Sequence, residues 1–125
     1  MDTAIGIKGK DFVLLVCDAN VTRSIQKLKE FEDKIVTIDD DKMMCLAGEV
    51  ADSKDFGNYI QKNVHLYKYR NGYKLSVKET ANWARRQMAT ALRRSPWQTN
   101  VMLAGYEEKT GPQLYWMDYL GTLSC

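Results

Sequence analysis

Two consecutive segments with a helical repeat lie between groups of strand-like segments, and this order constrains the fold more than any other feature of the chain. In residues 52–70 apolar side chains recur three and four positions apart, as on one face of a helix. These side chains belong to Phe56, Tyr59, Ile60, Val64 and Tyr67. Because glycine readily adopts the left-handed conformation of a helix end, we expect the first helix to end at Asn71-Gly72.

The second helical segment begins at Ser76, where Glu79 three positions later completes the pattern of a capping box. We expect this helix to end before Ser95-Pro96, because proline cannot continue a helix. Its apolar face comprises Val77, Ala81, Ala84, Met88 and Leu92. The two alanines on this face are small enough to let the helix approach a neighbouring surface closely.

Three pairs of strands are predicted around the helices, from short apolar or alternating runs that flank turn residues. The pairs are residues 3–9 with 12–18, 34–38 with 43–48, and 100–106 with 113–121. Gly6 and Gly9 indicate that another part of the chain approaches the first strand closely. Residues 19–33 are polar and partly helix-like, and we interpret them as a surface connection.

Strands and helices that come in blocks, without alternation, favour an α+β fold in which helices cover one face of an antiparallel sheet. With 125 residues the chain fits a single domain, residues 1–125. Two helices cover only one face of such a sheet, and the sequence ends directly after a strand. We therefore expect a domain that lacks its C-terminal part and exposes a sheet face prone to self-association.

The composition argues against several classes of protein. The chain has 18 basic and 16 acidic side chains, a net charge of +2, which disfavours a dedicated binder of nucleic acid or anionic membranes. The longest strongly apolar run, residues 12–17, is too short to span a bilayer. Cys17, Cys45 and Cys125 are widely spaced and odd in number, so we interpret them as free thiols.

Few side chains offer a catalytic base or a metal ligand. His65 is the only histidine, and it has no cysteine or carboxylate at ligand spacing on its helix, so we interpret it as structural. The run Asp39-Asp40-Asp41 lacks the spaced oxygen ligands and the glycine of a calcium loop, and a hairpin turn explains it. We therefore expect neither a metal nor another cofactor.

Four arginines in and after the second helix have two tryptophans nearby. They are Arg85, Arg86, Arg93 and Arg94, with Trp83 and Trp97. A solvated helix face or a protein interface explains these arginines better than RNA binding does, because the net charge is close to zero.

Five stretches along the whole chain form a recognisable pattern in their order and spacing: "IGIKGKDFVLLVCD", "DKI", "CLAGEVAD", "YIQKNVHLYKYRNGYKLS" and "AGYEEKTGPQLYWMDYLGTL". With these stretches the chain resembles the β-type subunits of the 20S proteasome, a branch of the N-terminal-nucleophile hydrolases. In detail they are most similar to the non-catalytic subunit at the fourth position of the eukaryotic β ring.

The resemblance implies a fold and a set of partners. The family fold is a four-layer αββα sandwich of antiparallel sheets, of which this chain would be the N-terminal portion without the C-terminal helices and strands. The implied partners are neighbouring β subunits and the α ring of the 20S particle, which serves ATP- and ubiquitin-dependent protein degradation in the cytoplasm and nucleus. No nucleic acid, membrane or cofactor is implied. The turn Asn71, Gly72 and Tyr73 would be an assembly contact.

Active members of the family use an N-terminal threonine as nucleophile, a lysine held by an aspartate, and a glycine N–H as oxyanion hole. Carried over by position, these sites fall on Asp2, Lys34, Asp18 and Gly48. Asp2 cannot replace the threonine hydroxyl, because its carboxylate is already ionised and Met1 precedes it. The resemblance therefore implies a degenerate, non-catalytic site.

Two further expectations follow from the resemblance. Lys34 and Asp18 would form a partly buried ion pair that ties two strands together. The alternative to a structural subunit is an active threonine peptidase, formed by processing that exposes Thr3 as the N-terminal residue.

Overall fold

The computed structural model describes residues 3–18, 21–23, 26–29 and 34–124. The described elements, in chain order, are β1 (Ala4–Lys8), β2 (Val13–Cys17), β3 (Val21–Arg23), β4 (Gln26–Lys29), β5 (Ile35–Asp39), β6 (Lys42–Gly48), α1 (Val50–Asn71), α2 (Val77–Ala91), β7 (Thr99–Glu107), β8 (Gly111–Met117) and β9 (Leu123–Ser124). Within the described residues, neither α1 nor α2 is both long enough and apolar enough to cross a membrane.

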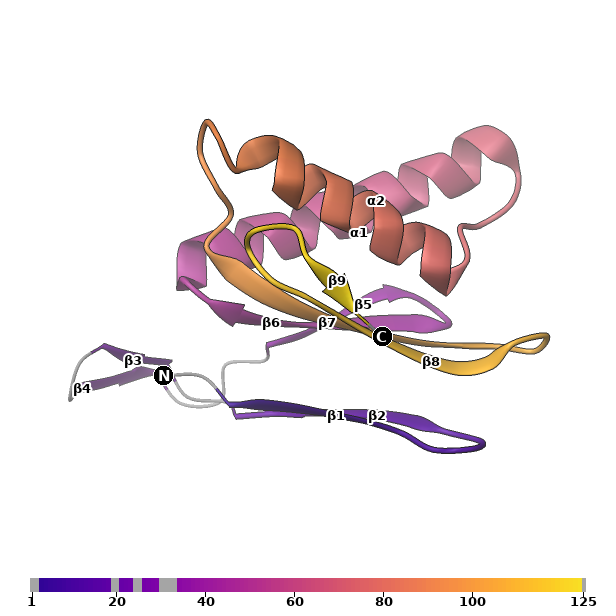
Figure 1. Ribbon diagram of the computed structural model, residues 1–125, viewed down its shortest axis with the longest axis horizontal. Coiled ribbons are helices and arrows are strands. Elements are labelled where there is room, and N and C mark those ends of the chain that lie inside the picture. Colours follow the sequence, from indigo (N-terminus) through magenta and orange to yellow (C-terminus); the bar gives the residue numbers. More distant parts are fainter. Residues whose placement is uncertain (1–2, 19–20, 24–25, 30–33, 125) are drawn as a thin grey trace.

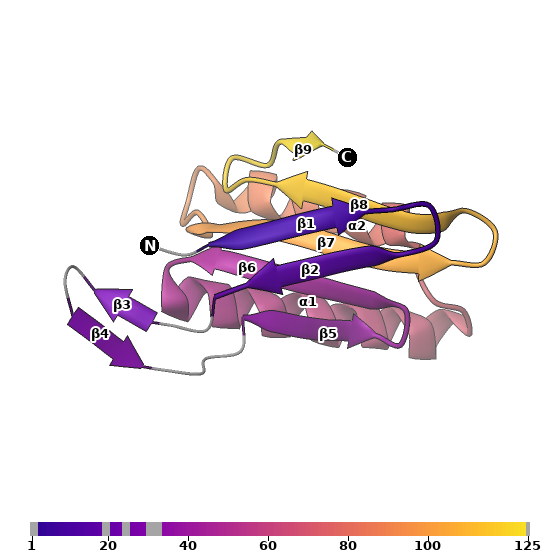
Figure 2. The ribbon, with the colours of Figure 1, turned by 90° about the horizontal axis from the view of Figure 1, so that it is seen from below.

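The elements form three layers (Figure 1). The middle layer is an antiparallel sheet with the strand order β5-β6-β7-β8-β9. On one face α1 packs on β5 and β6, and α2 packs on β7, β8 and β9. On the other face the antiparallel β1–β2 hairpin lies across β7 and β8 (Figure 2). The expected antiparallel sheet with helices on one face is therefore confirmed.

Both predicted helices form, with the ends that the sequence indicates. Ser76 Oγ accepts a hydrogen bond from Glu79 N at 3.1 Å, and Glu79 Oε1 accepts one from Ser76 N at 3.1 Å, which completes the capping box. At the end of α1, Gly72 has φ +76° and donates its N–H to Lys68 O. These caps fix the turn that joins α1 to α2.

The core lies between the helices and the middle sheet. Its buried apolar side chains are Ile38, Met44, Leu46, Phe56, Ile60, Val64, Val77, Ala81, Ala84, Met88, Val101, Leu103 and Met117. Burying one such large side chain contributes about 1.5–3 kcal/mol. The close approach of α2 depends partly on Gly105 in β7, because a Cβ there would lie 2.3 Å from Val77 Cγ2. Among the residues expected on the apolar faces of the two helices, Tyr59 and Leu92 are not fully buried: the Tyr59 side chain is 39% exposed and Leu92 is half-buried.

Three details of the strand prediction are wrong. The strand predicted over residues 113–121 ends at Met117, and the chain then turns into the separate strand β9. Part of the predicted surface connection forms the antiparallel hairpin β3–β4, whose short, polar strands give no apolar alternation to detect. The turn between β5 and β6 consists of residues 40–41 alone, because Asp39 and Lys42 belong to the strands.

The β1–β2 hairpin has two unlike faces. Toward the middle sheet, a Cβ at Gly6 would lie 3.0 Å from Leu114 and Met102, so this glycine permits the close approach that the sequence predicts. On the outer face Ile5, Ile7, Leu14 and Val16 are 47–51% exposed. Among the described residues no element covers this apolar face (Figure 1).

Candidate functional site

An ion pair joins the end of β2 to the start of β5. Lys34 Nζ lies 2.9 Å from Asp18 Oδ1, and the two side chains are 9% and 25% exposed. Thr3 N donates to the same oxygen at 3.1 Å, while Asp18 N donates to Thr3 O at 3.0 Å. The contact that the sequence predicts between Asp18 and Lys34 is therefore present, and the backbone of Thr3 adjoins it.

Two thiols lie next to this ion pair. Cys45 is 2% exposed, and Cys17 at the end of β2 is half-buried. The pKa of the Cys45 thiol is raised to about 12, chiefly by burial and next by its hydrogen bond with the Cys17 thiol. The Cys45 thiol is thus protonated at neutral pH, and it is not an activated nucleophile. Cys17 and Cys45 are free, as expected, and Cys125 lies outside the described residues.

Gly48 ends β6 in a backbone conformation that favours glycine. Its φ is +144°, and a Cβ there would lie 2.4 Å from Gln98 O. A hollow of about 440 Å³ adjoins this glycine and is bordered by Glu49, Pro96 and Tyr119. The close passage of the backbone at Gln98 requires a glycine at this position, whether or not the site is catalytic.

At the opposite end of α1, the turn into α2 makes ion pairs with the β5–β6 turn and an aromatic contact with α1. Lys74 Nζ lies 3.0 Å from Asp40 Oδ1 and 3.1 Å from Asp41 Oδ2, in the β5–β6 turn. These contacts raise the pKa of Lys74 and lower the pKa of the Asp40 carboxyl group. Burial opposes ionisation of Asp41, but hydrogen bonds from Lys42 and Lys74 still lower the pKa of that carboxyl group. Tyr73 is 59% exposed, with its hydroxyl 2.9 Å from that of Tyr67 and the two rings edge to face.

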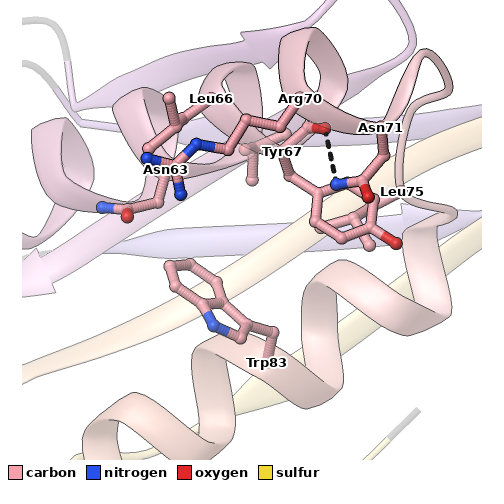
Figure 3. A pocket seen from close by; sticks show the side chains of 8 residues that line it. Asn63, Leu66, Tyr67, Arg70, Asn71, Leu75 and Trp83 are labelled. Atoms are coloured by element: carbon pink, nitrogen blue, oxygen red, sulfur yellow. Dashed lines mark hydrogen bonds between the residues drawn. The ribbon is translucent and has the colours of Figure 1, made fainter.

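A groove of about 290 Å³ lies between α1 and α2 beside this turn (Figure 3). Its lining includes Asn63, Leu66, Tyr67, Arg70, Asn71, Leu75 and Trp83. Asn71 Nδ2 donates to Tyr67 O at 3.0 Å, the contact dashed in Figure 3. The groove brings a guanidinium group beside an indole and two leucines, a combination common in protein interfaces.

The acidic run at the β5–β6 turn forms a network with lysines. The carboxylates of Asp39, Asp40 and Asp41 lie within 4.8 Å of one another. Besides the two contacts of Lys74, Lys42 Nζ lies 2.9 Å from Asp41 Oδ1 and Lys68 Nζ lies 3.7 Å from Asp39 Oδ1. The buried Asp39 Oδ2 has no hydrogen-bond partner. Lysine side chains therefore offset the charge of this turn.

Comparison with known proteins identifies the family. The family described as "Proteasome subunit" matches residues 1–124. The chain belongs to the proteasome subunit family. It is 43% identical over 98% of its length to "Proteasome subunit beta type-2" of Oryza sativa subsp. japonica and covers 58% of that protein.

Two further relatives agree with this assignment. The chain is 44% identical to "Proteasome subunit beta type-2" of Dictyostelium discoideum, over 98% of this chain and 64% of the relative. It is 40% identical to "Proteasome subunit beta type-4" of Saccharomyces cerevisiae, over 98% of this chain and 63% of the relative. The resemblance to proteasome β-type subunits is thus confirmed, and this proteasome subunit spans 58–64% of the length of these relatives.

In this proteasome subunit the residues carried over from the active family members are only partly brought together. Asp18 and Lys34 are in contact, and Gly48 ends the strand next to β5. Asp2 lies outside the described residues. His65 is half-buried on α1.

The groove beside the α1–α2 turn is one feature that the sequence did not predict. Leu66, Arg70 and Trp83 line it, and of these only Trp83 stands out in the sequence, as a tryptophan near the arginines of the second helix. One residue in the sequence could have indicated it: Leu66 is apolar but lies outside the predicted buried face of α1, and in the structure it is 44% exposed.

Proposed function

We propose that this chain is a non-catalytic β subunit of the 20S proteasome core particle, which contributes to assembly of the ring and not to peptide hydrolysis. The observation that carries the proposal is the position of the ion pair. Lys34 and Asp18 meet as in an active site of the family, yet the nucleophile position holds Asp2. Because a carboxylate stands in place of the terminal hydroxyl, we assign the Lys34–Asp18 pair a structural role.

The proposed architecture is the four-layer αββα sandwich of the family, of which the described residues supply one helical layer and two sheet layers. The half-exposed apolar face of β1 and β2 is consistent with a further layer over it in the whole subunit. We place the subunit in the cytoplasm and nucleus, within the particle that degrades proteins in an ATP- and ubiquitin-dependent manner.

The proposed partners are neighbouring β subunits and the α ring, with Asn71, Gly72 and Tyr73 as one contact. Tyr73 supports this role because it is held by Tyr67 while more than half of its surface is exposed. A fixed, exposed aromatic side chain loses little conformational entropy when it is buried by a partner. The groove beside the turn extends the same surface.

Peptide hydrolysis tests the catalytic half of the proposal. The chain is incubated with fluorogenic peptides that carry a basic, an acidic or an apolar residue before the reporter. We expect no turnover that a threonine-directed covalent inhibitor abolishes. Inhibitor-sensitive turnover, together with a native N-terminus at Thr3 in mass spectrometry, would establish the peptidase alternative instead.

Co-expression with neighbouring proteasome subunits tests the assembly half. We expect the subunit to enter ring intermediates on native gels. A chain that stays folded but never joins another subunit would contradict the structural role.

A further inference from the structure

A second hollow lies at the other end of the helix pair, between the first half of α1 and the end of α2. Its volume is about 630 Å³, and its lining comprises Tyr59, Gln87, Thr90, Ala91, Arg93, Arg94, Ser95 and Trp97. Of the four arginines in and after the second helix, Arg93 and Arg94 border this hollow, whereas Arg85 and Arg86 do not. A hollow of this size has room for a few side chains of a partner.

Two aromatic rings, Tyr59 and Trp97, line one wall of the hollow, and each packs against a further ring outside it. Tyr59 stacks on Trp83 with centroids 5.9 Å apart and approaches Trp97 at 6.4 Å. Trp97 also contacts the buried ring of Phe56 at 5.2 Å. Tyr59 Oη donates to Gln87 Oε1 at 3.1 Å, which fixes the tyrosine across the two helices. This wall therefore needs little reordering when a ligand packs against it.

The other wall is cationic. Arg93 and Arg94 are exposed in the turn that follows α2, and among the described residues no carboxylate forms an ion pair with either guanidinium group. By contrast, the lysines at the β5–β6 turn contact carboxylates of their own chain. Two guanidinium groups beside an aromatic wall complement a ligand with carboxylates and an apolar side chain.

We infer that this hollow is a docking site for an acidic segment of a protein partner, whose carboxylates pair with Arg93 and Arg94 while an apolar side chain packs against Trp97. The site lies beyond the proposed contact at residues 71–73 and does not depend on it. Nucleic acid fits less well, because Trp83 occupies one face of the Tyr59 ring and the net charge of the chain is only +2.

Fluorescence anisotropy with a labelled probe peptide, Glu-Asp-Leu-Phe-Glu-Asp, tests the site on the full chain. We expect saturable binding that weakens as salt is raised. The Arg93→Ala/Arg94→Ala variant should bind at least about tenfold more weakly, because charge-assisted hydrogen bonds are lost. The matched control, Lys78→Ala/Arg86→Ala, removes the same charge from exposed positions on α2 outside the hollow and should change affinity less than about twofold.

A second variant tests the hollow without removing an arginine. Thr90→Glu places a carboxylate in the lining and should weaken peptide binding by about tenfold, whereas Thr90→Gln should not. Absence of saturable binding, or equal loss in the Lys78→Ala/Arg86→Ala control, would overturn the inference. Tighter, arginine-dependent binding of an oligouridine strand would overturn it in favour of a nucleic-acid site.

Discussion

Lys34 Nζ and Asp18 Oδ1 lie 2.9 Å apart and connect the two sheet layers, since Asp18 follows β2 and Lys34 precedes β5. The lysine side chain is 9% exposed, so its ammonium group depends on this carboxylate for part of its solvation. The pair therefore connects the β1–β2 layer to the middle sheet.

A double-mutant cycle measures that connection. Lys34→Met should lower the free energy of unfolding by about 1–3 kcal/mol, because it removes the cationic partner of a partly buried carboxylate. Lys34→Met with Asp18→Leu should be better tolerated than either single change. Urea denaturation of the full chain gives the coupling energy. Coupling near zero would show that the contact contributes nothing to stability.

The exposed ring of Tyr73 should matter for assembly more than for folding. Tyr73→Ala should weaken association with the α ring by about 2 kcal/mol and leave the melting temperature nearly unchanged, because the side chain is 59% exposed. Tyr73→Phe is the matched control: it keeps the ring and its edge-to-face contact with Tyr67, loses only the hydroxyl contact, and should weaken assembly far less than Tyr73→Ala. An equal loss of folding stability would identify Tyr73 as a core residue.

Gly48 should be intolerant of a side chain for reasons of backbone geometry. Gly48→Ala should destabilise the fold by about 3 kcal/mol, because the methyl group would meet Gln98 O at 2.4 Å and φ is +144°. Gly111→Ala is the control, since Gly111 also has a positive φ of +76° but no atom within 4 Å of the added Cβ. It should cost about 1–2 kcal/mol. If thermal unfolding shows equal destabilisation by Gly48→Ala and Gly111→Ala, the backbone at Gln98 moves aside for the methyl group at little cost.

The sequence predicted the helices and the Asp18–Lys34 contact, each for a definite reason. Phe56, Ile60 and Val64 repeat at helical spacing and are all buried, and the Ser76 capping box is local in the chain. The ion pair came through the family resemblance, because charge alone does not pair residues sixteen positions apart. Composition and spacing offered no route to that contact.

The hairpin β3–β4 and the two hollows on the helix pair could not be predicted from the sequence, for different physical reasons. The strands β3 and β4 are only three and four residues long and mostly polar in sequence, so no apolar periodicity marks them. The hollows form where side chains of two helices leave space, as between Leu66 and Trp83. Such space depends on the packing of α1 against α2, which a linear pattern does not contain.

The raised pKa of Cys45 predicts a protected thiol. With a pKa of about 12, only about one thiol in ten thousand is ionised at pH 8, and the thiolate is the form that alkylating reagents attack. In the native chain Cys45 should react with iodoacetamide far more slowly than Cys17, whereas in urea both should react at similar rates. Mass spectrometry of the alkylated peptides gives the two rates. Rapid native labelling of Cys45 would contradict its burial.

The same thiol should make stability depend on pH under alkaline conditions. Its pKa rises from 9.0 for a solvated thiol to about 12 in the folded chain, so the unfolded chain loses this proton first as the pH rises. The stabilisation is complete below pH 9 and is lost progressively as the pH rises toward 12. Between pH 8 and pH 10.5 the unmodified chain should lose about 1–2 kcal/mol more than Cys45→Ala does. If the free energy of unfolding falls with pH equally in the unmodified chain and in Cys45→Ala, the Cys45 thiol does not contribute.

The outer face of β1 and β2 should make the chain self-associate. Ile5 pairs with Val16 across the hairpin, Ile7 pairs with Leu14, and all four side chains are about half exposed on one face. Burying this apolar surface against a second copy is favourable at about 25 cal/mol per Å². Sedimentation velocity of the full chain should therefore show a sedimentation coefficient that rises with protein concentration.

Ile5→Lys with Val16→Glu tests that face without changing the net charge. The two new side chains lie opposite each other in the hairpin, where an ion pair between them helps to preserve the strand pairing. The variant should stay monomeric to higher concentration than the unmodified chain. Tyr69→Ser is the control, because it removes the 82% exposed tyrosine from α1 and should leave self-association unchanged. If Tyr69→Ser abolishes self-association and Ile5→Lys/Val16→Glu does not, the copies meet through the helices and not through the hairpin.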